Sequence, residues 1–176
     1  MPAILRLPSD REHRIELMRE ATVMILYVSV VEIAELAALP ESHFSFGRTT
    51  GPVSDHLLVI VWGTAVGLAA AHWFAFRLAA PAFRGERPSH HDAQIGLAQL
   101  VGAMLVAALS SLPVLLFSDV RAQETAGDVP ALLVGVVGYL VARQIGSSRL
   151  ASFFLGLTAL LVGVLVALVK SLLAAH

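Results

Sequence analysis

Residues 150–173 read LASFFLGLTALLVGVLVALVKSLL, and Lys170 is their only charged side chain. About 20 mostly apolar residues suffice for a helix to cross the hydrocarbon core of a bilayer. A barrel strand would alternate apolar and polar residues over about ten positions, and this stretch shows no such alternation. The segment therefore predicts a membrane-spanning helix.

Four further runs have the same character, at about 21–39, 57–80, 95–117 and 129–145. Together they predict an all-α integral membrane protein, a bundle of five transmembrane helices in a single domain over residues 1–176. Residues 1–20 are charged and predict an amphipathic cytoplasmic lead-in rather than a cleavable signal peptide. Candidate helix caps precede each run: Ser9 with Glu12, Ser54, Ser89 with Asp92, Asp128, and Ser147 or Ser148.

Composition narrows the function classes. Hydrophobic residues make up 57% of the 176 residues and charged residues 14%, against about 45–50% and about 25% in soluble domains. The formal net charge of −1 argues against nucleic-acid binding. The absence of cysteine excludes disulfides and Cys-ligated metals. Lipid is the predicted environment, and the Ala, Val, Leu and Arg bias favours a bacterial plasma membrane.

The distribution of basic residues predicts the orientation. Arginines concentrate in residues 1–20, in the 81–94 loop and around 143–149, whereas Arg48, Arg121 and Lys170 fall on the opposite side. Because cytoplasmic loops carry the excess of Lys and Arg, the N-terminus is predicted to be cytoplasmic and the C-terminus external.

The first apolar run contains two carboxylates, Glu32 and Glu35. Three residues apart, they share one helix face, at depths of about 10 Å and about 6 Å if the run ends near Leu39. Two carboxylates so close in low dielectric do not both stay ionised unless a cation sits between them. The pair predicts proton relay or cation coordination; the alternative is that Glu35 reaches interfacial water and Glu32 bonds a neighbouring helix.

Other runs place polar groups at a similar depth. Thr64, Ser110 and Ser111 fall in the outer half by the same helical rise. With the two glutamates they would form an oxygen-rich pocket, and oxygen ligands suit protons and hard cations. Serine and threonine in membrane helices also often bond only their own backbone.

His72 lies in the cytoplasmic third of its run, about 14 Å from the depth of Glu32. A histidine can exchange protons near neutral pH, so His72 is a candidate member of the pathway, linked to Glu32 through water or Tyr139. An enzyme acting on lipid or quinone would use His72, Arg77 and Glu32, but no nucleophile or metal motif accompanies them. The sequence implies no cofactor.

Two loop clusters contain metal-ligand residue types, and neither has diagnostic spacing. One is His90–His91–Asp92, and the other is Glu41, His43, Asp55 and His56. Adjacent histidines in a loop rarely chelate one ion, which weakens the first cluster. The sequence therefore does not decide whether either cluster binds a metal.

Small residues Gly63, Gly67 and Ala71 form a stripe on the second run, and such stripes let membrane helices approach closely. We expect another helix of the same chain or of a second copy to cover it. The favoured function is an oligomeric channel or transporter for protons or small inorganic cations. The alternative is a scaffold, sensor or partner subunit whose polar groups only lock the bundle.

Overall fold

A computed structural model describes residues 10–38, 53–84, 90–117, 125 and 127–174. Within them the chain is helical, as predicted, and each predicted apolar run falls almost wholly within one helix. The helices are α1 (Asp10–Ala37), α2 (Val53–Arg84), α3 (His90–Leu116), α5 (Asp128–Gln144) and α6 (Arg149–Ala174).

Three of the five helices are long and apolar enough to cross a membrane. The qualifying segments are Asp55–Ala75 in α2, His90–Leu116 in α3 and Arg149–Val166 in α6. Helix α1 has the length, at 28 residues, but carries several acidic residues along it. Helix α5 has only 17 residues, short of the usual length of about 20.

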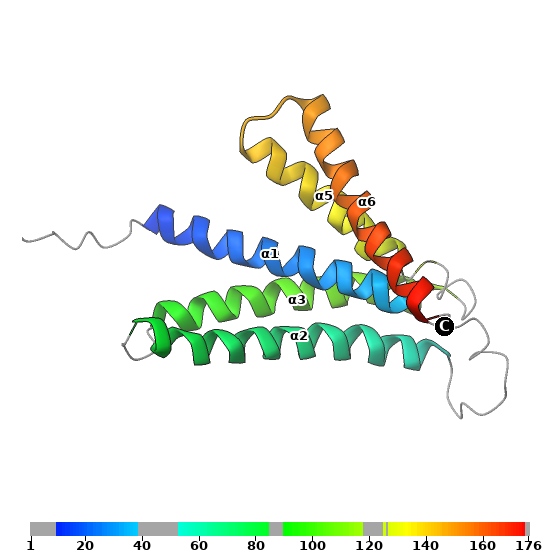
Figure 1. Ribbon diagram of the computed structural model, residues 1–176, viewed down its shortest axis with the longest axis horizontal. Coiled ribbons are helices and arrows are strands. Elements are labelled where there is room, and N and C mark those ends of the chain that lie inside the picture. Colours follow the sequence, from blue (N-terminus) through cyan, green and yellow to red (C-terminus); the bar gives the residue numbers. More distant parts are fainter. Residues whose placement is uncertain (1–9, 39–52, 85–89, 118–124, 126, 175–176) are drawn as a thin grey trace, which may run out of the picture.

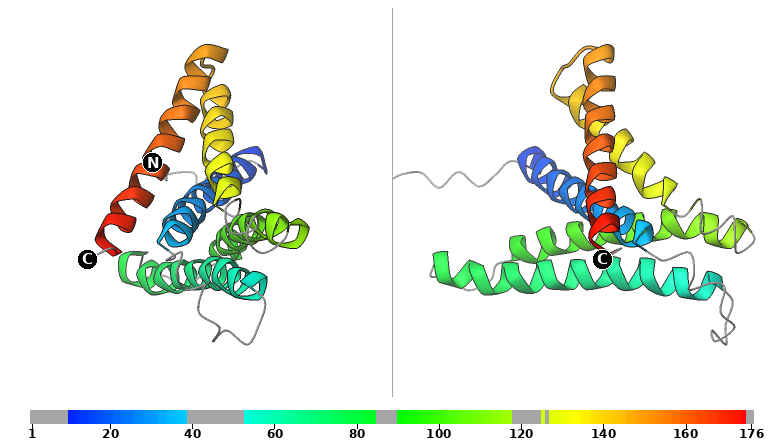
Figure 2. Two further views of the ribbon diagram at one scale, coloured as in Figure 1. Left: turned by 90° about the vertical axis from the view of Figure 1, so that its right-hand side faces the viewer. Right: turned by 45° about the vertical axis from the view of Figure 1, so that its right-hand side comes forward.

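Helices α1, α2 and α3 lie side by side with alternating direction (Figure 1). The end of α1, the start of α2 and the end of α3 lie toward the same end of this layer, and α5 starts there. From there the α5–α6 hairpin leans away at a steep angle, and both views in Figure 2 show its turn standing clear of the layer. The described helices thus form this layer and a leaning hairpin, and the crossing of a membrane by all five helices stays a prediction.

The layer packs around an apolar centre. Met24 and Val28 of α1 are buried against Val61 of α2 and Val106 of α3. Glycine allows a close α1–α3 approach, because a Cβ at Gly102 would lie 2.6 Å from the backbone oxygen of Ala21.

The hairpin rests on the C-terminal half of α1. Ile33 of α1 and Val134 of α5 form a buried cluster, with Val30 and Ala159 packed against it. Helix α1 contacts all four other helices. It is the element around which the layer and the hairpin are joined.

Glycines hold the two hairpin helices together. A Cβ at Gly156 of α6 would lie 2.6 Å from the backbone oxygen of Gly135 on α5. The turn needs glycine too, because Gly146 has a φ of +86°, which side chains rarely tolerate.

The predicted caps have different outcomes. The Ser148 hydroxyl accepts a hydrogen bond from the Ala151 amide at 3.2 Å, so Ser148 caps α6 as predicted. The prediction for Asp128 is wrong: Gly127 is the N-cap and makes no side-chain cap bond. Ser9, Ser89 and the side chain of Ser54 lie outside the described residues.

The predicted Gly63–Gly67–Ala71 stripe lies on an exposed side of α2. A Cβ at Gly63 or Gly67 would meet no atom within 4 Å among the described residues. No described helix of this chain covers the two glycines, so contact with a second copy stays a prediction.

The glycine contacts predict different changes in stability for two similar substitutions. Gly156→Ala places its methyl against rigid backbone, so we expect a loss of about 1–3 kcal/mol in unfolding free energy. Gly63→Ala places its methyl in space that no described residue of the same chain fills and gains helix propensity, so the stability of the monomer should be unchanged or slightly higher. Thermal unfolding in mild detergent compares them, and an equal loss in both variants would contradict the described hairpin packing.

Candidate functional site

Glu32 is the most deeply buried acidic side chain among the described residues. It is 1% exposed, on the part of α1 that faces α3. The hydroxyl of Ser110, itself fully buried, donates a hydrogen bond to Oε2 of Glu32 at 2.7 Å. The predicted proximity of Glu32 and Ser110 is therefore present in the structure.

The other carboxylate oxygen of Glu32 has bonding capacity left. No described group bonds its buried Oε1 or the buried hydroxyl oxygen of Ser29, three residues earlier on α1. A buried acceptor without a donor carries a desolvation cost of about 1–3 kcal/mol. It also retains lone pairs that can take a proton, a water hydrogen or a cation.

Glu35 is held by a second helix. The hydroxyl of Thr64 on α2 donates a hydrogen bond to Oε2 of Glu35. The two carboxyl groups thus have different partners, since Glu32 is bonded to α3 and Glu35 to α2. Both bonds join α1 to another helix of the layer.

Ser111 belongs to a different contact from the one predicted. Its hydroxyl donates to the backbone oxygen of Ala107 at 2.7 Å and accepts a bond from Nε1 of Trp62 at 3.0 Å. Sequence reasoning missed Trp62, although an indole nitrogen in a packed interface usually finds an acceptor. Ser111 supports the α2–α3 contact rather than bonding either glutamate.

His72 lies apart from the glutamate pair. It lines a cavity of about 160 Å³ with Glu20, Tyr27 and Gln99. Twelve residues of α1 separate Glu20 from Glu32, a rise of about 18 Å. Met24 and Val28, both buried, fill that interval.

The residues proposed for a relay or a lipid enzyme are not gathered together. Tyr139, suggested as a link, instead lines a groove between α5 and α6 with Gly135 and Gly156. The guanidinium of Arg77 stacks over the ring of Trp73, 5.0 Å from its centroid. Among the described residues, His72, Arg77 and Glu32 do not form one site.

The predicted loop metal clusters have separate outcomes. His90, His91 and Asp92 begin α3 rather than lying in a loop, and Nε2 of His91 lies 3.2 Å from Oε2 of Glu16 on α1. Asp55 and His56 are exposed at the start of α2, and Glu41 and His43 lie outside the described residues.

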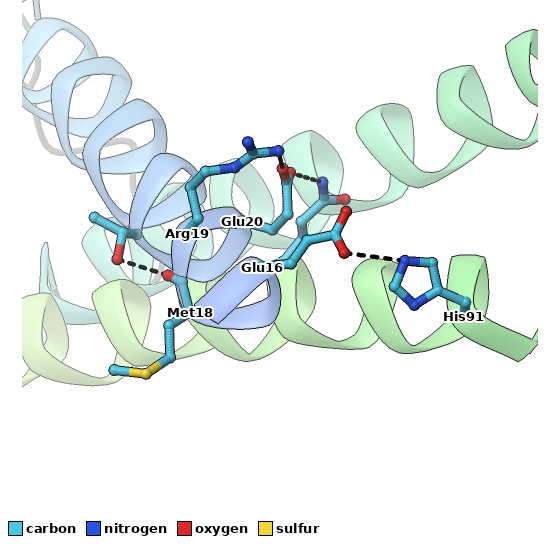
Figure 3. Close-up of polar contacts among 7 residues, drawn as sticks. Glu16, Met18, Arg19, Glu20 and His91 are labelled. Atoms are coloured by element: carbon cyan, nitrogen blue, oxygen red, sulfur yellow. Dashed lines mark hydrogen bonds and ion pairs between the residues drawn. The ribbon is translucent and has the colours of Figure 1, made fainter. Parts of the chain in front are cut away.

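Glu20 lies on α1, one residue before the predicted span, and two side chains bond its carboxylate. It accepts hydrogen bonds from Arg19 at 2.9 Å and from Gln99 at 3.0 Å (Figure 3). Burial alone would raise the pKa of Glu20, but the bonds from Arg19 and Gln99, together with the charges of Arg19 and His72, outweigh it and leave this pKa below its usual value. The carboxylate form is therefore favoured in the folded protein.

No protein-family model matches the chain, and no curated protein or solved structure matches it. The functional argument therefore rests on the geometry of this chain.

The lowered pKa of Glu20 predicts a pH-dependent stability. A carboxyl group whose folded pKa is depressed contributes stability above its unfolded pKa, and the contribution is lost as pH falls through the folded value. The melting temperature of the wild type should therefore exceed that of Glu20→Gln at pH 7, and the gap should shrink as the pH falls below about 4.5. A gap that widens on acidification would contradict this assignment.

Proposed function

We propose that this chain is a membrane protein that moves protons or small inorganic cations, with Glu32 as the central residue and Glu35 as its partner. The observation that carries the proposal is the buried carboxyl of Glu32, with Oε2 bonded to Ser110 and Oε1 bonded by no described group. A group of that kind can pick up and release a proton or a cation while Ser110 holds its position.

The cost of placing an acidic side chain in a membrane helix supports a function that uses its charge. An acidic residue at the centre of a membrane helix costs at least about 2.5 kcal/mol on insertion scales. A neutral glutamine or serine would bond Ser110 at a lower cost. Two acids on one face of α1 therefore favour a function in which a titratable proton or a negative charge is needed.

A membrane setting is supported by the surface as well as by the three apolar helices. Large apolar side chains point outward on several helices, among them Val59 on α2, Leu112 on α3 and Phe153 on α6. Lipid would cover these side chains. In the proposed topology all five helices cross a bacterial plasma membrane, with the N-terminus inside and the C-terminus outside.

Because the centre of the layer is apolar, transport in this proposal requires an oligomer or a conformational change. Met24 and Val28 separate the His72 cavity from Glu32, so the described residues do not form a continuous polar path along α1. In the proposal, a second copy seated on the Gly63, Gly67 and Ala71 face supplies the rest of the pathway, with Thr64 and Ser110 beside the acids and His72 at the inner end.

A second candidate function has its own supporting observation. The bonds Glu32–Ser110 and Glu35–Thr64 each tie α1 to a different helix. A scaffold, sensor or partner subunit could use the same bonds only to lock its helices, with no flux.

Flux through liposomes separates the two candidates. The purified chain is reconstituted and proton, Na⁺ and K⁺ fluxes are measured for the wild type, Glu32→Gln and Glu35→Gln. We expect Glu32→Gln to reduce flux at least about tenfold while folding is retained, because glutamine keeps the shape and hydrogen bonding but has no titratable proton. Glu35→Gln should reduce flux as well.

The matched control is Asp128→Asn, which neutralises an exposed acid at the start of α5 and should leave flux unchanged. Wild-type flux in both glutamate variants, or no wild-type flux for any of the three ions, would reject transport and favour the scaffold.

A further inference from the structure

Three metal-ligand side chains meet at the end of the layer that lies away from Glu32. His13 and Glu16 are three residues apart and share a face of α1, and His91 is the second residue of α3. The Nε2 atom of His91 lies 3.2 Å from Oε2 of Glu16, a contact drawn in Figure 3. The rings of His13 and His91 have centroids 5.0 Å apart.

We propose that His13, Glu16 and His91 bind one divalent transition-metal ion of the Zn²⁺ class. One possible ligand atom from each residue lies within 4.8 Å of the other two. Two imidazole nitrogens and one carboxylate oxygen form a donor set that proteins use for Zn²⁺. Imidazole also favours Zn²⁺, Cu²⁺ and Ni²⁺ over Mg²⁺ and Ca²⁺, which prefer oxygen alone.

One of the three distances between ligand atoms already fits tetrahedral coordination. Metal–ligand bonds of about 2.0–2.1 Å place two ligands of a tetrahedron about 3.3 Å apart. The Glu16–His91 separation of 3.2 Å already has this value. A side-chain rotation of His13 closes the remaining distance, and three protein ligands leave a fourth position for water.

Arg19 is a neighbouring cation: it bonds Glu20 and also attracts Glu16. Glu20, one turn further along α1, is already bonded by Arg19 and Gln99. The three ligand residues are partly exposed, whereas His90, next to His91, is exposed and outside the cluster. An ion can therefore reach the cluster from solvent.

Binding would have a structural consequence. The ion would join the first turns of α1 to the first turn of α3, at the opposite end of α1 from its contact with the hairpin. It would add to the hydrogen bonds that already join α1 to α2 and α3 at Glu20, Glu32 and Glu35. This site is independent of the proposed transport function.

Zinc titration of the untagged full-length chain in mild detergent tests the proposal. Isothermal calorimetry with ZnCl₂ should show one site per chain, and the same addition should raise the melting temperature. His13→Ala and Glu16→Gln should each weaken Zn²⁺ binding at least about 100-fold, since even residues that only support metal ligands cost about 10–100-fold.

His90→Ala is the matched control, because it removes the histidine adjacent to His91 without removing a ligand. Zinc affinity in this variant should equal that of the wild type. Equal losses in His90→Ala and His13→Ala, or wild-type binding no tighter than that of Glu16→Gln, would overturn the proposal. Metal-free melting temperatures of the variants show whether they fold, and His13→Ala removes no ion pair recorded among the described residues.

Discussion

The hydrogen bond from Ser110 to Glu32 is the interaction on which the rest of the arrangement depends. It lies in a fully buried part of the α1–α3 interface, where the carboxyl group has lost its contact with water. A buried acid without a donor would favour separation of the two helices. With the donor in place, α1 can stay between α3 and the hairpin and still carry a buried acid in its last turns.

Helix α1 combines three environments along its length. Its first turns are polar and meet α3 through Glu16 and Glu20, its middle is apolar at Met24 and Val28, and its last turns carry Glu32 and Glu35. The apolar middle explains why α1 packs tightly in the layer. The two polar ends explain why it lacks the composition of an ordinary membrane span, and they provide the two candidate sites, one for transport and one for a metal ion.

Much of the fold and part of the site could be predicted from the sequence. The apolar runs predicted the helices and Ser148 predicted a helix cap, because both signals depend only on residues close together in the sequence. The Glu32–Ser110 contact was predictable from matched depth alone. The lean of the hairpin, the Trp62–Ser111 bond and the meeting of His13 with His91 depend on how helices rotate and cross, and sequence spacing within one helix carries no such information. The depth estimate placed His72 about 14 Å from Glu32, but it could not show that the buried side chains of Met24 and Val28 lie between them.

The most direct test of this account compares two buried serines. Ser110 bonds Glu32, whereas Ser29 is equally buried on α1 and no described group bonds its hydroxyl. Unfolding free energies in mild detergent should fall by about 1–3 kcal/mol for Ser110→Ala and should be unchanged or slightly higher for Ser29→Ala. In a Glu32→Leu background, which has no carboxyl group to satisfy, Ser110→Ala should lose most of its effect. Equal effects of the two serine substitutions, or an undiminished Ser110→Ala effect in that background, would contradict the central role of the Glu32–Ser110 bond.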